Sequence, residues 1–230
     1  MIDEKIIHSN NKKIKVLYIA GTARSGSTFL GNILSDGKDF INVGELRYIW
    51  DRGIIENWQC TCHNNFAYCS FWKKITTSLS HKNKNLSKIC NDISERSFKK
   101  IRIRNLIFNS AKKIKKTISD NKEYNTILSD LYMDIKSYSK NAYILDSSKD
   151  AIYAEYLSQL TNIELYIIHI VRDPRSVIYS QVYNRKVQSI DQKRSFIMGT
   201  SFFKSLSSWY IQNYLIEKLH AKKENYFFIK

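Results

Sequence analysis

Glycine and proline are scarce in this chain of 230 residues, which has 7 of the first and 1 of the second. That scarcity excludes collagen-like and linker-rich proteins. Apolar runs are short as well: residues 166–171 form one of the longest, far below the ~20 residues that a membrane-spanning helix needs. Charged and polar residues follow Met1, where a secretory signal would have an apolar core. We therefore expect a soluble, cytoplasmic protein without a transmembrane segment.

Acidic residues are also few, 21 against 37 lysines and arginines, which leaves a net charge of +16. Such an excess favours polyanions or anionic small molecules as partners. The abundance of Lys, Asn, Ile and Tyr is equally typical of an AT-rich genome, and that bias alone accounts for the charge just as well. Because the sequence has no DNA- or RNA-binding signature, we do not expect nucleic acid to be the partner.

Hydrophobic residues make up 43% of the chain, enough for the core of one domain of ordinary size. Short β-rich runs predict strands at residues 15–20, 40–43, 142–145, 165–171 and 226–229. Helical spacing of apolar residues predicts helices at residues 27–34, 151–160 and 195–222, and another that starts at Pro174. This alternation indicates an α/β fold with a parallel sheet flanked by helices.

The segment between the second and third predicted strands differs from this pattern. Residues 51–72 are expected to be irregular, and residues 73–140 to form a largely helical insertion in a single domain that spans residues 1–230. The helices of the insertion have lysine-rich faces opposite apolar residues such as Phe98 and Ile101. A charged face of this kind is usually solvated, and contact with a membrane surface or a polyanion is the alternative.

The segment after the first predicted strand is comparable to a Walker A loop, which reads Gly, four residues, Gly, Lys and then Ser or Thr. Gly21, Gly26 and Thr28 fit that spacing. Ser27 stands where the lysine belongs, and Arg24 supplies a cation inside the loop instead. A strand, a tight loop and a helix N-terminus still make an anion cradle, but one suited to a short anionic arm rather than a triphosphate. A turn without a ligand and a nucleotide kinase are the alternatives.

The run Arg24, Ser25, Gly26, Ser27, Thr28 resembles the 5′-phosphosulfate loop of the PAPS-dependent sulfotransferase superfamily, where PAPS is 3′-phosphoadenosine 5′-phosphosulfate. The similarity is greatest to the Arg-Ser-Gly-Ser/Thr-Thr form of the bacterial carbohydrate-type and tyrosylprotein-type enzymes. This resemblance implies a P-loop-type α/β fold and these five residues as the donor-binding loop. It also implies PAPS as the sulfuryl donor, PAP as the product, and no metal in the active site.

A second part of the family's pattern follows the predicted strand at residues 165–171. In the resembled enzymes an Arg at this strand end and a Ser eight residues later hold the 3′-phosphate of PAPS, and Arg172 and Ser180 stand at that spacing. A guanidinium offers a phosphate a two-pronged donor, and open α/β sheets bind ligands at the carboxyl ends of their strands. The alternative for Arg172 is an ordinary surface ion pair with Asp173 or another neighbouring residue.

Three residues are candidates for the chemistry of sulfuryl transfer, which needs cations on the departing oxygens and a base for the acceptor proton. By analogy with phosphoryl transfer, Arg24 is the expected cation. The resemblance implies Glu45 as the base and Lys149 as the residue that neutralises charge on the bridging oxygen. The alternatives are structural: Glu45 as a carboxylate at a helix start, and Lys149 as an exposed residue beside a helix cap formed by Ser147 or Ser148.

Three of the four cysteines, Cys60, Cys62 and Cys69, lie close together in the sequence, with His63 beside them. Zinc binds such ligands, but the single residue between Cys60 and Cys62 is short for a zinc motif. Cys-rich segments followed by Phe-Trp also occur in bacterial members of the resembled family. Reduced thiols, a disulfide and a metal site are all open, and a cytoplasmic location disfavours the disulfide.

The function we expect is transfer of the sulfuryl group of PAPS to a hydroxyl or amine of an acceptor, with a carbohydrate or a lipid ahead of a peptide tyrosine or a small phenol. One alternative is a non-catalytic family member that binds a nucleotide or another anion, and a more distant one is a P-loop kinase. The resemblance covers about residues 14–62 and 142–185. In the family further segments follow the strand at 226–229 and help cover the nucleotide, so we expect this chain to lack them.

Overall fold

The computed structural model of the protein describes residues 13–83, 86, 90, 111–182, 187–190, 193–196 and 201–230. Five strands in these residues form one sheet in the order β2-β3-β1-β4-β7, and every neighbouring pair is parallel. The strands are β1 (Ile14–Gly21), β2 (Phe40–Gly44), β3 (Tyr143–Lys149), β4 (Ile163–Ile170) and β7 (Tyr226–Ile229). The α/β fold with a parallel sheet flanked by helices is thus confirmed.

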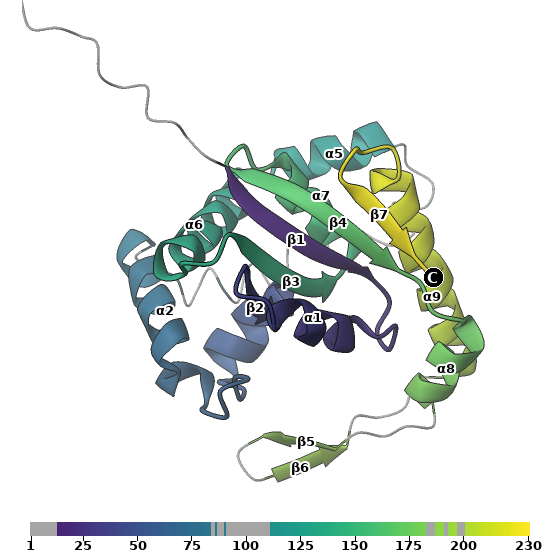
Figure 1. The fold of residues 1–230 in the computed structure, drawn as a ribbon, viewed down its shortest axis with the longest axis horizontal. Coiled ribbons are helices and arrows are strands. Elements are labelled where there is room, and N and C mark those ends of the chain that lie inside the picture. Colours follow the sequence, from purple (N-terminus) through teal and green to yellow (C-terminus); the bar gives the residue numbers. More distant parts are fainter. Residues whose placement is uncertain are drawn as a thin grey trace, which may run out of the picture.

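Helices cover both faces of the sheet (Figure 1). The connection from β1 to β2 contains α1 (Ser27–Ser35), and the connection from β3 to β4 contains α7 (Ala151–Gln159). Because these connections run in opposite directions along the sheet, right-handed crossovers place α1 and α7 on opposite faces. The long α9 (Phe202–His220) packs beside α7 and against β1.

The central strand β1 is packed on both faces, because its successive side chains point alternately to the two helical layers. Toward α7, Tyr18 is fully buried and its ring centroid lies 6.2 Å from that of Tyr153. Toward α1, Gly31 packs closely against the sheet: a methyl group added there would lie 3.3 Å from the Asn42 amide nitrogen and in ordinary contact, at 3.9 Å, with side chains of Ile19 and Leu145. The two layers clamp β1 and fix the loop that leaves it.

Among the described residues, the segment 73–140 contains most of α2 (Ser70–Lys82) and all of α5 (Ala111–Ser119) and α6 (Lys122–Tyr138). The helix predicted around Phe98 and Ile101 lies outside the described residues. The prediction that residues 51–72 are irregular was wrong in part, because a π-helical turn at Ile49–Ile55 and a 3₁₀ turn at Phe66–Tyr68 occupy much of this segment.

Two predicted boundaries also need correction. β3 continues to Lys149 rather than ending near residue 145, because its polar residues Asp146, Ser147 and Ser148 are buried and hydrogen-bonded instead of forming a loop. α9 begins at Phe202 rather than at 195, after Ser201, whose hydroxyl accepts a bond from the N–H of Lys204. Residues 195 and 196 belong instead to β6 (Lys193–Phe196), which pairs in antiparallel fashion with β5 (Val187–Ile190).

The carboxyl ends of the five strands meet at one edge of the sheet, since all are parallel. In Figure 1 the arrowheads of β1, β4 and β7 point toward α8 (Pro174–Val182) at this edge. The segments predicted to bind or react with a ligand all follow these strand ends.

No helix in the part of the chain that the structure describes has the length and apolar character required to cross a bilayer.

Candidate active site

Residues 22–26 link β1 to α1 in a tight loop. Two of them have left-handed backbones, Arg24 with φ 71° and Gly26 with φ 99°. Gly26 is the N-cap residue of α1, and it has no side chain with which to satisfy the first N–H groups of the helix. These N–H groups have no partners within the helix and lie at the positive end of its dipole. The loop therefore has the backbone donors of an anion cradle.

The hydroxyl groups of this loop are turned inward. Thr22, Ser25 and Ser27 are all buried, and Ser27, which stands at the position of a Walker lysine, is uncharged. The Ser25 Oγ is buried and has no hydrogen-bond partner among the described residues. Leaving such a group unpaired costs about 1–3 kcal/mol, and an anion bound in the loop would relieve that cost by accepting its proton.

The loop is joined to the end of β4 by a close backbone approach. Gly21 has φ 151°, and a methyl group added to it would lie 2.5 Å from the carbonyl oxygen of Ile170. Because only glycine allows this approach, the chain that leaves β4 passes directly beside the loop. There the guanidinium of Arg172 donates to the carbonyl oxygen of Arg24 at 3.1 Å, and Gln181 of α8 donates to that of Ala23 at 3.1 Å.

Arg172 and Ser180 line the same open hollow, whose volume is about 580 Å³. The other lining residues are Arg175, Ser176 and Tyr179. The alternative pairing of Arg172 with Asp173 is not the one observed: Asp173 pairs with Arg175 at 2.7 Å, and this bond lowers the pKa of the carboxyl to about 2. The structure thus brings together the two residues predicted to hold a 3′-phosphate.

Glu45 and Lys149 come from the ends of β2 and β3 and are in direct contact. The Lys149 Nζ donates to the carboxylate of Glu45 and, at 3.0 Å, to the carbonyl oxygen of Ser147. Only 12% of the Lys149 side chain is exposed, so the alternative of a solvent-exposed lysine was wrong. Glu45 is the N-cap residue of a 3₁₀ turn at Leu46–Tyr48, so it does stand at a helix start, but its side chain makes no capping hydrogen bond. Its carboxylate also accepts a bond from Arg52 at 3.4 Å and so lies between two cations.

The cap alternative for residues 147 and 148 was wrong as well. The N-cap of α7 is Asp150, whose Oδ1 accepts bonds from the N–H groups of Ile152 and Tyr153 at 2.9 and 2.8 Å. Ser148 serves a different purpose, since its hydroxyl accepts a bond from the backbone N–H of Arg47 at 2.9 Å. That bond ties the segment after β2 to the end of β3.

Strand order places the predicted groups in one row along the edge of the sheet. β1 lies between β3 and β4, with Ala20 opposite Lys149 and Gly21 opposite Ile170. The loop at 22–26 therefore has the Glu45–Lys149 pair on one side and Arg172 on the other. A ligand with two separated anionic groups could reach both the loop and the hollow at Arg172.

A buried carboxylate, not singled out in the sequence, supports the end of β3. The Asp146 Oδ2 accepts a bond from the Tyr132 hydroxyl at 2.5 Å, and its Oδ1 accepts bonds from the N–H and hydroxyl of Ser148 at 2.8 and 2.5 Å. Burial raises the pKa of Asp146 to about 6, although these hydrogen bonds favour the charged form. The network holds the backbone from which Lys149 projects.

Helix α9 supplies two further contacts that sequence reasoning missed. The Trp209 indole donates to the carbonyl oxygen of Arg172 at 3.1 Å, and the Gln212 amide donates to that of Lys149 at 3.0 Å. Both side chains are on one helix, so α9 connects the two sides of the loop. No local signal in the sequence marks them, because their partners are distant in the chain.

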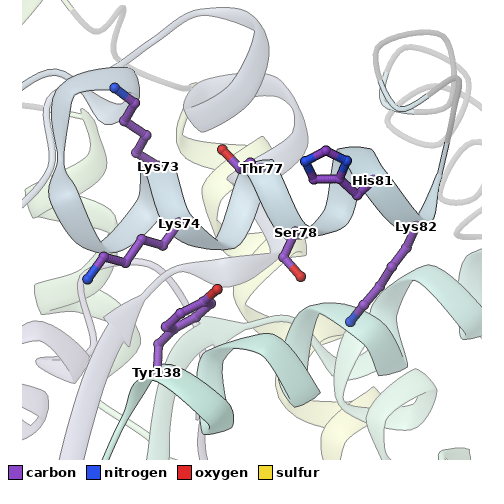
Figure 2. A pocket seen from close by; sticks show the side chains of 7 residues that line it. All are labelled: Lys73, Lys74, Thr77, Ser78, His81, Lys82 and Tyr138. Carbon is purple, nitrogen blue, oxygen red and sulfur yellow. The ribbon is translucent and has the colours of Figure 1, made fainter.

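A second hollow, of about 540 Å³, lies between α2 and Tyr138 at the end of α6 and includes none of the predicted site residues (Figure 2). Four basic side chains line it together with Thr77 and Ser78: Lys73, Lys74, His81 and Lys82. Figure 2 shows Lys73 and Lys74 pointing apart, and Lys82 pairs with Asp134 at 2.6 Å. We assign no chemistry to this hollow.

Comparisons with known proteins add little to this geometry. No protein-family profile matches the chain, and no curated protein does. Among solved structures, the chain is similar to a "Sulfotransferase Domain from the Curacin Biosynthetic Pathway", with 13% sequence identity and a TM-score of 0.45. The match covers 94% of this chain and 66% of that one. A likeness at this level assigns neither family nor function.

Proposed function

We infer that this protein is a sulfotransferase that moves the sulfuryl group of PAPS to a hydroxyl or amine of an acceptor. The observation that carries the proposal is the row of groups at the strand ends: the uncapped loop at 22–26 lies between the Glu45–Lys149 pair and Arg172. One loop for an anion and a separate arginine-lined hollow match a donor with two separated anionic groups.

Donor binding would use both anion sites. The N–H groups at the start of α1 and the guanidinium of Arg24 would hold the 5′-phosphosulfate. Arg172 and Ser180 would hold the 3′-phosphate through a charge-assisted guanidinium contact and a hydroxyl. No bridge between β- and γ-phosphates is needed, which agrees with a buried serine, Ser27, at the Walker lysine position.

In the chemical step the acceptor oxygen or nitrogen attacks sulfur, and the bond from sulfur to the bridging oxygen of the 5′-phosphate breaks. Arg24 and Lys149 would stabilise the negative charge that grows on the departing PAP. Glu45 would take the proton that the acceptor loses. We propose a carbohydrate or lipid hydroxyl as the acceptor, and this choice rests on the family resemblance alone.

Titration calorimetry with 3′,5′-ADP tests the donor site. We expect binding that does not depend on Mg²⁺ and that weakens by about 10- to 100-fold in Arg172→Ala, since a hydrogen bond to a charged group contributes about 1.5–3 kcal/mol. Arg175→Ala is the matched control: it removes the same charge from the same hollow, but this guanidinium already pairs with Asp173. Its loss should be only a few-fold.

Three results would contradict the proposal. A folded wild-type protein that does not bind 3′,5′-ADP has no such donor site. Equal losses of affinity in the two arginine variants would mean that Arg172 contributes only its positive charge and no specific contact. Binding of ATP only with Mg²⁺ would favour a kinase. If 3′,5′-ADP binds as expected, incubation with radiolabelled PAPS and panels of sugar and lipid acceptors distinguishes an enzyme from a protein that only binds the nucleotide.

A further inference from the structure

Three cysteine sulfur atoms lie close together in the segment before α2. The Sγ atoms of Cys60, Cys62 and Cys69 are all within 4.8 Å of one another. Cys60 is partly buried, Cys62 is exposed and Cys69 is buried, and all three are free thiols. The sequence left thiols, a disulfide and a metal site open, because spacing along the chain does not reveal how closely the third sulfur atom approaches the first two.

A tight hairpin loop brings the first two sulfur atoms together. Gln59 and Asn65 form an antiparallel bridge, and the N–H of Cys60 donates to the carbonyl oxygen of Asn64 at 2.8 Å. Within the loop, the N–H of His63 donates to the carbonyl oxygen of Cys60 at 2.9 Å, with His63 in a left-handed conformation at φ 66°. These bonds fold the chain back on itself, which is how the Cys62 Sγ comes within 4.8 Å of the Cys60 Sγ.

The third sulfur atom is fixed from the other side. Cys69 is the residue immediately before α2, and its N–H donates to the carbonyl oxygens of Asn65 and Phe66 at 3.1 and 3.2 Å. The stacked rings of Phe66 and Trp72, whose centroids lie 5.1 Å apart, anchor this turn in the core. The position of Cys69 is therefore fixed both by core packing and by its bond to Asn65 at the base of the hairpin loop.

Three converging thiols suit a metal ion better than a disulfide. A disulfide would use two sulfur atoms and leave the third beside it, whereas Zn²⁺ with bonds of ~2.3 Å in tetrahedral geometry holds thiolates about 3.8 Å apart. The observed limit of 4.8 Å allows that spacing with a small inward shift. The Asn64 amide donates to the Cys62 Sγ at 3.7 Å, the kind of outer contact that orients a thiolate ligand.

We propose that Cys60, Cys62 and Cys69 bind one Zn²⁺ ion as thiolates, with the fourth position taken by water on the side of the exposed Cys62. Binding releases the three thiol protons and involves no oxidation or reduction. The same three residues are the only group of three or more His, Cys, Asp or Glu side chains within metal-binding reach of one another in the described part of the chain.

The site would brace the active-site carboxylate through a short chain of contacts. The carbonyl oxygen of Trp58 accepts a bond from the N–H of Phe66 at 2.9 Å, and the guanidinium carbon of Arg52 lies 4.9 Å from the Trp58 ring. Arg52 in turn reaches Glu45 at 3.4 Å. A metal ion that fixes the segment 58–69 would thus fix the cation beside Glu45, so its role is structural and separate from donor binding.

Titration of the reduced full-length chain with Co²⁺, followed by competition with Zn²⁺, tests the site directly. We expect one equivalent of Co²⁺ to produce a thiolate-to-cobalt charge-transfer band with the visible bands of tetrahedral coordination, and Zn²⁺ to abolish both. Cys62→Ala should weaken Zn²⁺ binding by about 100-fold or more, because it removes one of three ligands that hold the metal. Cys62 is exposed, so this variant should fold.

Cys90→Ala is the matched control, because Cys90 is the remaining cysteine and is not in the cluster. It should bind Co²⁺ and Zn²⁺ as the wild type does. Absence of a charge-transfer band in reduced wild-type protein, or equal Zn²⁺ affinity in wild type and Cys62→Ala, would overturn the proposal. These outcomes do not depend on 3′,5′-ADP, so the metal site and the sulfotransferase proposal can fail independently.

Discussion

Helices α1 and α7 both begin where a strand of the central sheet ends, yet their first turns differ. At α7 the carboxylate of Asp150 accepts bonds from two N–H groups of the helix. At α1 the corresponding residue is Gly26, which has no side chain to offer. The protein itself completes the first turn of α7, whereas the first turn of α1 has no side-chain cap, and in the function that we propose an anion takes that place.

The two connections also differ in their charge. Asp150 pairs with Arg47 at 2.8 Å, and their side chains are only 16% and 23% exposed, so the β3–α7 connection is internally neutralised. The β1–α1 loop contains Arg24 and no acidic residue in the first turn of the helix. One connection is therefore neutralised within the fold and holds Lys149, and the other keeps the positive charge that the proposed anion site requires.

Removal of the cap tests the structural half of this comparison and should have the largest effect. Asp150→Ala is expected to lower the free energy of unfolding by about 3 kcal/mol, of which the cap contributes ~1 and the poorly exposed pair with Arg47 the remainder. Asp150→Asn keeps an oxygen that can cap the helix but loses the charge, so it should cost less. Urea unfolding measures both variants, and identical losses would mean that the cap contributes nothing.

Addition of a cap at α1 tests the ligand-binding half. Gly26→Asp would place a carboxylate where the anion is expected, and 3′,5′-ADP binding should weaken by about 100-fold through competition for the same N–H groups and charge repulsion. Gly26→Asn adds a side chain of the same shape at the same strained φ of 99° without the charge. Calorimetry should find a smaller loss for Asn, and equal losses would indicate that shape, not charge, matters.

The buried support beneath Lys149 should produce the smallest effect, visible as a dependence on pH. The pKa of Asp146 is about 6 in the folded chain against 3.8 as the ordinary value, so protonation favours folding. This contribution to stability is fully present below about pH 3.8 and is lost as the pH rises through 6. The free energy of unfolding should fall by about 2 kcal/mol between pH 4 and 6 for this reason.

Asp146→Asn is uncharged throughout and should lack this loss. Urea unfolding of both proteins at several pH values between 4 and 6 isolates the contribution, because every other titrating group is common to the two. If the difference in unfolding free energy between them stays constant over this range, Asp146 does not titrate as its burial suggests.

Much of the fold could be predicted from the sequence because its signals are local. The runs at 15–20 and 165–171 are apolar and β-rich, and they form the buried strands β1 and β4. The glycine spacing at 21–28 likewise indicated a strand, a tight loop and a helix. The sequence did not predict that β3 continues through its polar residues, because the burial of Asp146 depends on Tyr132, which belongs to α6.

By itself the sequence determined which residues carry charge, which can turn sharply and which repeat with the period of a strand or a helix. Only the tertiary structure decided which of them meet. The contact between Lys149 and Glu45, the two bonds from α9 and the convergence of Cys69 with Cys60 and Cys62 all join segments positioned by different parts of the core. The physical reason is that such contacts depend on strand order and packing, which no short stretch of sequence encodes.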